Sequence, residues 1–113
     1  MQFYHHPRCR KSREALALLR DKGIEPEIVL YLQDTPSRQE IKALLKKLGM
    51  PARDLVRRGE PIFREKYKGR ELSEAEWIDA LAGHPQLLER PILVKGDKAV
   101  VGRPPEKVLD LIA

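Results

Sequence analysis

Residues 2–32 of the chain, QFYHHPRCRKSREALALLRDKGIEPEIVLYL, predict the start of an α/β fold. Residues 2–4 form a short apolar run typical of a strand. Residues 12–21 carry apolar side chains at helical spacing, and Gly23 is placed to end that helix. Residues 28–32 are a continuous aliphatic run, typical of a strand buried on both faces. Two strands joined through one helix are expected to be parallel, with a right-handed crossover.

The rest of the chain predicts several helices and then a hairpin. Residues 37–40 and 73–76 each have the Ser-x-x-Glu pattern of a capping box at a helix start. We expect the first of these helices to end at Gly49 and the second to reach about Leu81. Two apolar triplets flank the sequence KGDK at residues 95–98, a pattern typical of a hairpin.

A last helix is expected after Pro104-Pro105, so the order is β-α-β, several helices, then β-β-α. This order predicts a thioredoxin-like mixed sheet of the α/β class, with a helical insert at about residues 35–88. We expect residues 1–113 to form a single domain, because no linker, repeat or change in composition divides them. In this layout the loop after the first strand carries the active thiol.

The composition excludes several classes of function. With 42% hydrophobic residues the chain can form one core, and no apolar run approaches the roughly 18 residues of a membrane span. A net charge of +5 favours anionic partners, but aromatic residues are few and no nucleic-acid-binding motif occurs. We therefore expect a monomer that binds a small oxyanion or an anionic thiol, and neither nucleic acid nor a membrane. A single cysteine cannot form an internal disulfide, which favours the reducing cytoplasm.

That cysteine, Cys9, lies in a strongly basic loop. Arg8, Arg10, Lys11 and Arg13 all lie within four residues of it. A lone cysteine is most often a small buried apolar side chain, but Cys9 lies outside the apolar periodicity of the following helix. We therefore interpret it as a nucleophilic thiolate at a helix N-terminus.

A helix N-terminus alone is too weak to activate this thiol. Lowering the pKa from about 8.5 to about 6.5 requires about 2.7 kcal/mol. A helix terminus supplies about 0.3 to 1 kcal/mol, and about 2 in favourable geometries. The candidates for the remainder are His5, Arg13, the Ser12 hydroxyl and arginines from elsewhere in the chain. Ser12 also occupies the position of the second cysteine in a CxxC motif, so the second thiol must be external: glutathione, a glutaredoxin or another protein.

Five motifs resemble those of the glutaredoxin-dependent arsenate reductase family. Residues 5–13, HHPRCRKSR, resemble the family's H-N-P-x-C-x-x-S-R loop, with His6 where the family has asparagine. The other motifs are EP at residues 25–26 with LYL at 30–32, LVRR at 55–58, ERPILV at 89–94 and GRPPE at 102–106. The resemblance spans essentially the whole chain and implies reduction of arsenate to arsenite.

The resemblance also implies roles for individual residues. Cys9 matches the nucleophile that attacks arsenate and forms a thiol–arsenate adduct. Arg57, Arg90 and Arg103 match three anion-binding arginines, which suit a bidentate hold on a tetrahedral oxyanion. Arg13, in the thiol loop, is a further candidate for substrate binding.

His5 and Ser12 match positions that support the thiolate. Pro91 precedes the third strand, where thioredoxin-like proteins carry a cis proline beside the active thiol. The resemblance implies no bound cofactor and no metal, with glutathione as co-substrate and a glutaredoxin as protein partner.

Other interpretations of these residues stay open from the sequence. Arg57 could be a solvated helix charge like Arg58, Arg103 could bind a carboxylate, and His5 could be a hydrogen-bonded histidine at a strand end. The chain could also be a glutathione-dependent thiol oxidoreductase acting on another substrate. A third alternative is an Spx-like regulator that binds RNA polymerase and senses oxidation, although Ser12 removes the CxxC switch found in many of those proteins.

Overall fold

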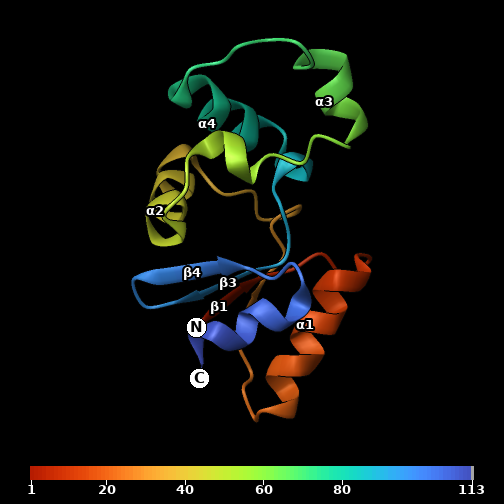
Figure 1. The fold of residues 1–113 in the computed structure, drawn as a ribbon, viewed down its shortest axis with the longest axis vertical. Coiled ribbons are helices and arrows are strands. Elements are labelled where there is room, and N and C mark those ends of the chain that lie inside the picture. Colours follow the sequence, from red (N-terminus) through yellow and green to blue (C-terminus); the bar gives the residue numbers. More distant parts are fainter. Residues whose placement is uncertain (113) are drawn as a thin grey trace. The chain divides into compact units, whose positions relative to one another are not determined.

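A computed structural model describes residues 1–112 and divides the chain into two compact units, whose elements are drawn in Figure 1. The first unit contains Met1–Asp34 and the segment that begins at Arg90. The second unit is Thr35–Glu89. The first unit is therefore built from both ends of the sequence, and the second is inserted into it. Within residues 1–112 no helix has the length and apolar character needed to cross a membrane.

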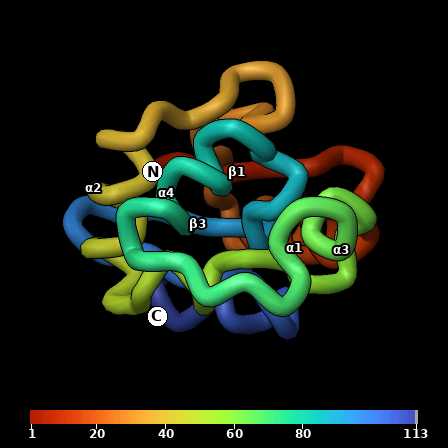
Figure 2. The backbone as a smooth tube through the Cα atoms, turned by 90° about the horizontal axis from the view of Figure 1, so that it is seen from above, coloured from red at the N-terminus to blue at the C-terminus, as the bar shows by residue number. Residues whose placement is uncertain are grey.

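The first unit is a four-stranded mixed sheet with two helices packed on it. Its elements are β1 (Gln2–Tyr4), α1 (Arg10–Asp21), β2 (Glu27–Val29), β3 (Ile92–Lys95), β4 (Lys98–Val101) and the 3-10 helix η3 (Pro105–Leu111). The strand order is β2-β1-β3-β4; β1 is parallel to β2, and the other two pairs are antiparallel. Figure 2 shows β1 beside β3, although they come from opposite ends of the chain. The predicted mixed α/β fold is confirmed, including the parallel pairing of the first two strands and the hairpin.

The core of this unit forms where α1 and η3 pack against the sheet. Ala15 and Leu19, four residues apart on α1, are fully buried in one cluster with Phe3 of β1. Tyr4, the last residue of β1, pairs with Ile92, the first residue of β3. The loop after β1 and the segment before β3 therefore lie side by side at the same end of these two strands.

The second unit is helical. Its elements are α2 (Arg38–Leu48), η1 (Ala52–Leu55), α3 (Pro61–Lys66), α4 (Glu74–Gly83) and η2 (Pro85–Leu87). The predicted capping boxes at Ser37 and Ser73 are both confirmed, since each hydroxyl accepts the backbone N–H of the glutamate three residues later. Helix α2 packs against α4, and a β-bridge joins Val56, after η1, to Leu88, near the end of the unit.

The prediction of a doubly buried strand over residues 28–32 is wrong. Strand β2 covers only Glu27–Val29, lies at the edge of the sheet and has an exposed first residue. Directly after it the Leu30 carbonyl accepts the N–H groups of Gln33 and Asp34, which turns the chain. The aliphatic run therefore ends the strand and forms the turn that follows it.

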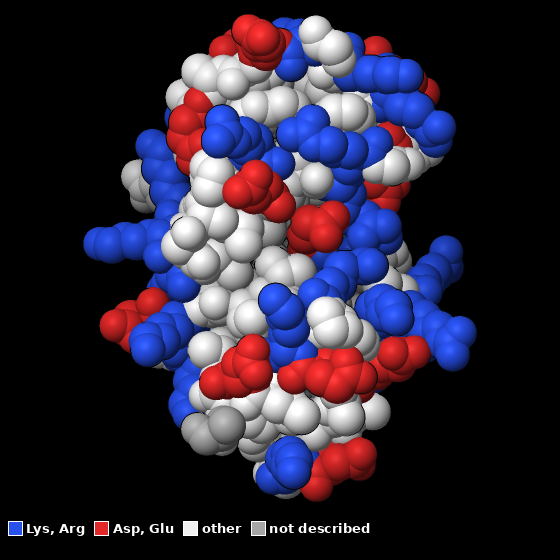
Figure 3. All heavy atoms as spheres, in the orientation of Figure 1, with Lys and Arg blue, Asp and Glu red and all other residues white. Residues whose placement is uncertain are grey.

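Charged side chains of both signs share the surface. On the face drawn in Figure 3, Lys and Arg are interspersed with Asp and Glu and form no single basic patch. Two exposed arginines on α1 form ion pairs: Arg10 with Glu14 and Arg20 with Glu25. Such exposed pairs contribute about 0 to 1 kcal/mol each, so they balance charge more than they stabilise the fold.

Candidate active site

Cys9 is the N-cap residue of α1. Its backbone is extended, and its N–H donates to the His6 carbonyl at 2.9 Å. The thiol is half-buried. The side chain is therefore available for chemistry at the position where the first N–H groups of the helix have no helical partner.

The surroundings of Cys9 favour its thiolate form. Burial alone would raise the pKa of Cys9, but three groups outweigh it. The Ser12 N–H hydrogen-bonds to the sulfur, the Arg90 guanidinium acts by hydrogen bond and by charge, and the Lys11 N–H adds a further hydrogen bond. The pKa of Cys9 is therefore lowered below its ordinary value, which increases the nucleophilic fraction at neutral pH.

Arg103 is the second guanidinium at the sulfur. Its Nη2 lies 3.6 Å from Cys9 Sγ, and its Nε donates to the Arg90 carbonyl at 2.7 Å. The peptide bonds Arg90-Pro91 and Arg103-Pro104 are both cis; the first lies where the resemblance implied a cis proline. Two arginines, one before β3 and one after β4, thus converge on the thiol.

Gly102 allows this close arrangement of the two segments. Its N–H donates to the Pro91 carbonyl at 2.8 Å. A Cβ atom at Gly102 would lie 2.9 Å from Pro91 Cγ and 3.0 Å from Val108 Cγ1, closer than side-chain carbons pack. Glycine is therefore required here by close approach, and it places Arg103 beside Arg90.

His5 and Ser12 form a buried pair beneath the loop. His5 Nδ1 lies 2.6 Å from Ser12 Oγ, which also accepts the His6 N–H at 3.1 Å. The pKa of His5 is lowered, mainly by burial and also by the charges of His6, Arg20 and Arg13. A neutral His5 can accept the Ser12 hydroxyl proton at Nδ1. The Ser12 hydroxyl is thus engaged by His5 and His6, and Ser12 supports the sulfur through its backbone N–H.

The other two candidate arginines are placed differently. Arg13 is exposed, and its Nη1 donates to the Pro7 carbonyl at 2.9 Å, so it braces the loop. Arg57 belongs to the second unit, is half-buried, and lies between two carboxylates: its Nε is 3.4 Å from Glu60 and its Nη1 is 4.0 Å from Glu89. Within the first unit the structure therefore brings together Cys9, Arg90 and Arg103, whereas Arg57 is described only within its own unit.

Arg58 has another environment than its neighbour. Its guanidinium carbon lies 5.3 Å from the ring centre of Phe63 and 5.7 Å from that of Trp77. This cation–π contact is a packing role within the second unit. The two adjacent arginines can therefore be told apart by what they contact.

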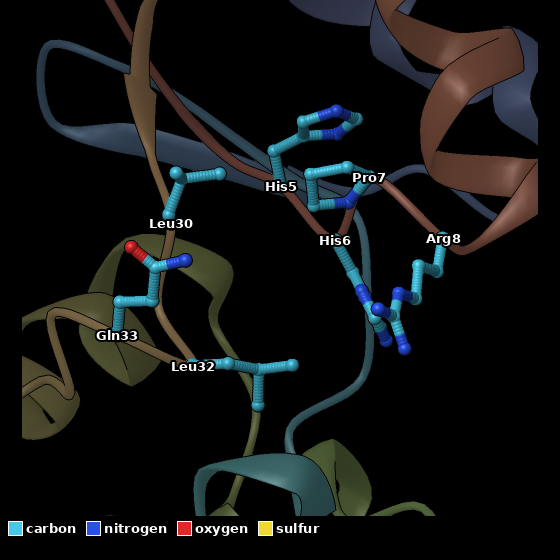
Figure 4. Close-up of a pocket in the computed structure, with 7 residues that line it drawn as sticks. All are labelled: His5, His6, Pro7, Arg8, Leu30, Leu32 and Gln33. Atoms are coloured by element: carbon cyan, nitrogen blue, oxygen red, sulfur yellow. The ribbon is translucent and has the colours of Figure 1, made fainter.

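A cavity of about 290 Å³ lies beside the thiol loop, drawn in Figure 4. It is lined by His5, His6, Pro7, Arg8, Leu30, Leu32 and Gln33. Its walls come from two segments of the first unit, the loop that precedes Cys9 and the turn that follows β2. Among residues 1–112, no three His, Cys, Asp or Glu side chains are grouped as metal ligands.

The sequence model of one protein family matches nearly the whole chain, residues 4–111. The chain belongs to the ArsC family. An arsenate reductase of Haemophilus influenzae is 46% identical over 111 residues, which cover 96% of each protein. An uncharacterized Escherichia coli K12 protein, YfgD, is 46% identical over 99% of this chain and 96% of its own length. The solved structure of an arsenate reductase from Vibrio cholerae superposes with a TM-score of 0.92 at 44% identity, covering 97% of both chains.

Sequence reasoning missed two contacts of this ArsC-family site. The first is the hydrogen bond between His5 and Ser12, which the sequence identified only as separate candidates. The two residues are seven positions apart, one after a strand and one in a helix, and no sequence pattern predicts that such residues contact each other. The cavity wall formed by Leu30 and Leu32 was also missed, because that segment was predicted as a strand. The exposure of Leu32, 40%, shows that it is not a core residue.

Proposed function

We infer that this ArsC-family chain is an arsenate reductase that uses Cys9 as its nucleophile. The convergence of Arg90 and Arg103 on a thiol of lowered pKa carries this inference. The same two guanidinium groups that favour the thiolate can bind the oxygens of a tetrahedral oxyanion. Relatives named arsenate reductase, at 41 to 46% identity over nearly the full length, support this substrate.

The reaction begins when the Cys9 thiolate attacks arsenic(V). A sulfur–arsenic bond forms, and one arsenate oxygen leaves as water after taking up protons. Arg90 and Arg103 stabilise the negative charge that remains on the other oxygens. Fixed guanidinium groups supply this stabilisation without reorganising during the step.

Two external thiols complete the cycle. Arsenic gains two electrons, and the two thiols lose two electrons and two protons to become a disulfide; the products are arsenite, the disulfide and water. Ser12 occupies the position of a resolving cysteine, so an internal disulfide cannot form. We propose glutathione and a glutaredoxin as the thiol donors, with no bound cofactor, in a monomer that works in the reducing cytoplasm.

The test is arsenate-dependent oxidation of NADPH, coupled through glutathione reductase, glutathione and glutaredoxin. Wild-type protein should show turnover that depends on arsenate, and the Cys9→Ser variant should show none. Arsenate turnover equal in both proteins would overturn the assignment of Cys9. NADPH oxidation that does not depend on arsenate would overturn the assignment of arsenate as the substrate.

Arg57 is proposed as a further oxyanion ligand, on the basis of the resemblance. Arg57 is half-buried between Glu60 and Glu89, so it is not the solvated helix charge that the sequence left open. The Arg57→Lys variant should raise KM for arsenate about tenfold, because lysine cannot make the bidentate contact. Arg58→Lys is the matched control, and equal effects of the two substitutions would contradict the proposal. An effect of Arg57 alone would also support our proposal that residues 1–113 act as one functional domain.

A further inference from the structure

The cavity beside the thiol loop has no part in the chemistry described above. Its volume, about 290 Å³, is just below the range of about 300 to 1,000 Å³ typical of ligand pockets. In Figure 4 the side chains of Leu30, Leu32 and Gln33 point from the turn after β2 toward the thiol loop on the other side. The cavity can therefore hold a ligand between these two segments.

The walls of the cavity combine apolar surface with positive charge. Pro7, Leu30 and Leu32 provide the apolar part, and 40% of Leu32 is exposed. When a ligand covers such an exposed apolar side chain, the complex is stabilised by about 25 cal/mol for each Å² of apolar surface removed from water. Gln33 adds an amide that can both donate and accept hydrogen bonds.

Arg8 provides the charge at the cavity. Other exposed arginines of this unit are engaged: Arg10 with Glu14, and Arg13 with the Pro7 carbonyl. Within residues 1–112, by contrast, Arg8 makes neither an ion pair nor a hydrogen bond. Its guanidinium is therefore an available partner for a carboxylate on a ligand in this cavity.

The side chains that line the cavity fit one of the two reactants of the proposed reaction, the thiol co-substrate, better than arsenate. Arsenate is a small, fully polar anion and would gain nothing from the two leucines. A thiol that carries carboxylates and amides on an aliphatic frame matches all three wall types. Such a thiol is also what the proposed cycle requires, since Cys9 has no second cysteine in the chain.

We propose that this cavity is the binding site of the thiol co-substrate, a small anionic thiol peptide. A ligand carboxylate pairs with Arg8, its amides hydrogen-bond to Gln33, and its aliphatic part covers Leu30 and Leu32. The loop that carries Arg8 leads directly to Cys9, so the ligand is held next to the segment that carries the nucleophile. This inference rests on the proposed function for its chemistry, but its binding test does not need turnover.

The first experiment measures binding with S-methylglutathione, a probe that cannot react with Cys9. Titration into the wild-type protein, followed by NMR, should shift the signals of Arg8, Leu32 and Gln33 with saturation. Leu32→Trp should fill the cavity and weaken binding at least tenfold, and circular dichroism would verify that this variant is folded. Absence of saturable binding to the wild type, or shifts confined to residues outside the cavity, would overturn the proposal whether or not arsenate is reduced.

The second experiment compares two variants that each remove one positive charge next to Cys9. Arg8→Gln should raise KM for glutathione about tenfold, whereas Arg10→Gln should change it less than twofold. With dithiothreitol, which has no carboxylate, the two variants should behave alike. If both variants raise KM for glutathione equally, the charge of Arg8 acts on the thiolate and not on the ligand. If Arg8→Gln changes only KM for glutaredoxin, a protein surface occupies this position; either result overturns the proposal.

Discussion

Replacing Arg103 with glutamine should raise the pKa of the Cys9 thiol by about 1 to 2 units. Arg103 is a fixed charge, because its Nε is bound to the Arg90 carbonyl at 2.7 Å while its Nη2 lies 3.6 Å from the sulfur. Glutamine keeps a hydrogen-bonding group at this position but removes the charge. The variant therefore tests the charge itself.

The magnitude follows from the distance of 3.6 Å between Arg103 Nη2 and Cys9 Sγ. Two unit charges at this separation attract by about 1 kcal/mol in a medium like water and about 5 kcal/mol at an effective dielectric constant of 20. At 1.36 kcal/mol for each pKa unit, these limits are about 0.8 and about 3.4 units. Cys9 is half-buried and the guanidinium charge is delocalised, so we expect about 1 to 2 units.

The assay is the rate of alkylation by iodoacetamide as a function of pH, since only the thiolate reacts. Arg10→Gln is the matched control: Arg10 is also next to Cys9 in sequence, but its Nε is bound to Glu14 at 2.9 Å. The Arg103→Gln curve should shift to higher pH by the amount stated, and the Arg10→Gln curve by less than half of that. A shift below 0.3 unit in Arg103→Gln, or equal shifts in both variants, would refute the reasoning from fixed geometry.

Three further predictions concern the support of the loop. Ser12→Ala leaves the buried His5 ring nitrogen without its partner, so the free energy of unfolding measured in urea should fall by about 1 to 3 kcal/mol. Because the pKa of His5 is lowered in the fold, the unfolded chain takes up that proton more readily; stability should therefore fall as the pH decreases below about 6.5. In thermal unfolding, His5→Asn should reduce this acid dependence and the control His84→Asn should not. Gly102→Ala should lower the free energy of unfolding by about 1 to 3 kcal/mol, because the new methyl group would meet Pro91; an unchanged melting temperature would contradict the close packing.

Elements with local signals could be predicted from the sequence. The capping boxes at Ser37 and Ser73 satisfy helix N–H groups within four residues, so the pattern and the contact lie in the same short segment. The hairpin of β3 and β4 is equally local. These elements were predicted because their stabilising contacts need no knowledge of the rest of the fold.

Elements that depend on distant partners were predicted less well. The apolar run that begins at Ile28 favours a strand. However, β2 pairs with β1 over three residues only, and a turn begins at Leu30. Helix α3, Pro61–Lys66, was not predicted, because a six-residue segment with one buried side chain, Phe63, has no apolar periodicity to reveal it.

The same distinction holds for the candidate site. Cys9 could be identified from its basic loop, because its neighbours in sequence already indicate thiol chemistry. Arg90 and Arg103 could be identified only through the family resemblance, since no local pattern links either of them to residue 9. Their contact with the thiol depends on the pairing of β1 with β3 and on the close approach at Gly102.

The interrupted first unit has a consequence for synthesis of the protein. Cys9 and Arg103 are separated by 94 positions, and ribosomes add about 5 to 20 residues per second, so roughly 5 to 20 s pass between them. During that interval the nascent chain lacks one or both of the guanidinium groups, Arg90 and Arg103, that converge on the thiol in the folded protein. The full set of contacts at the thiol is therefore completed only when the last strands of the sheet are in place.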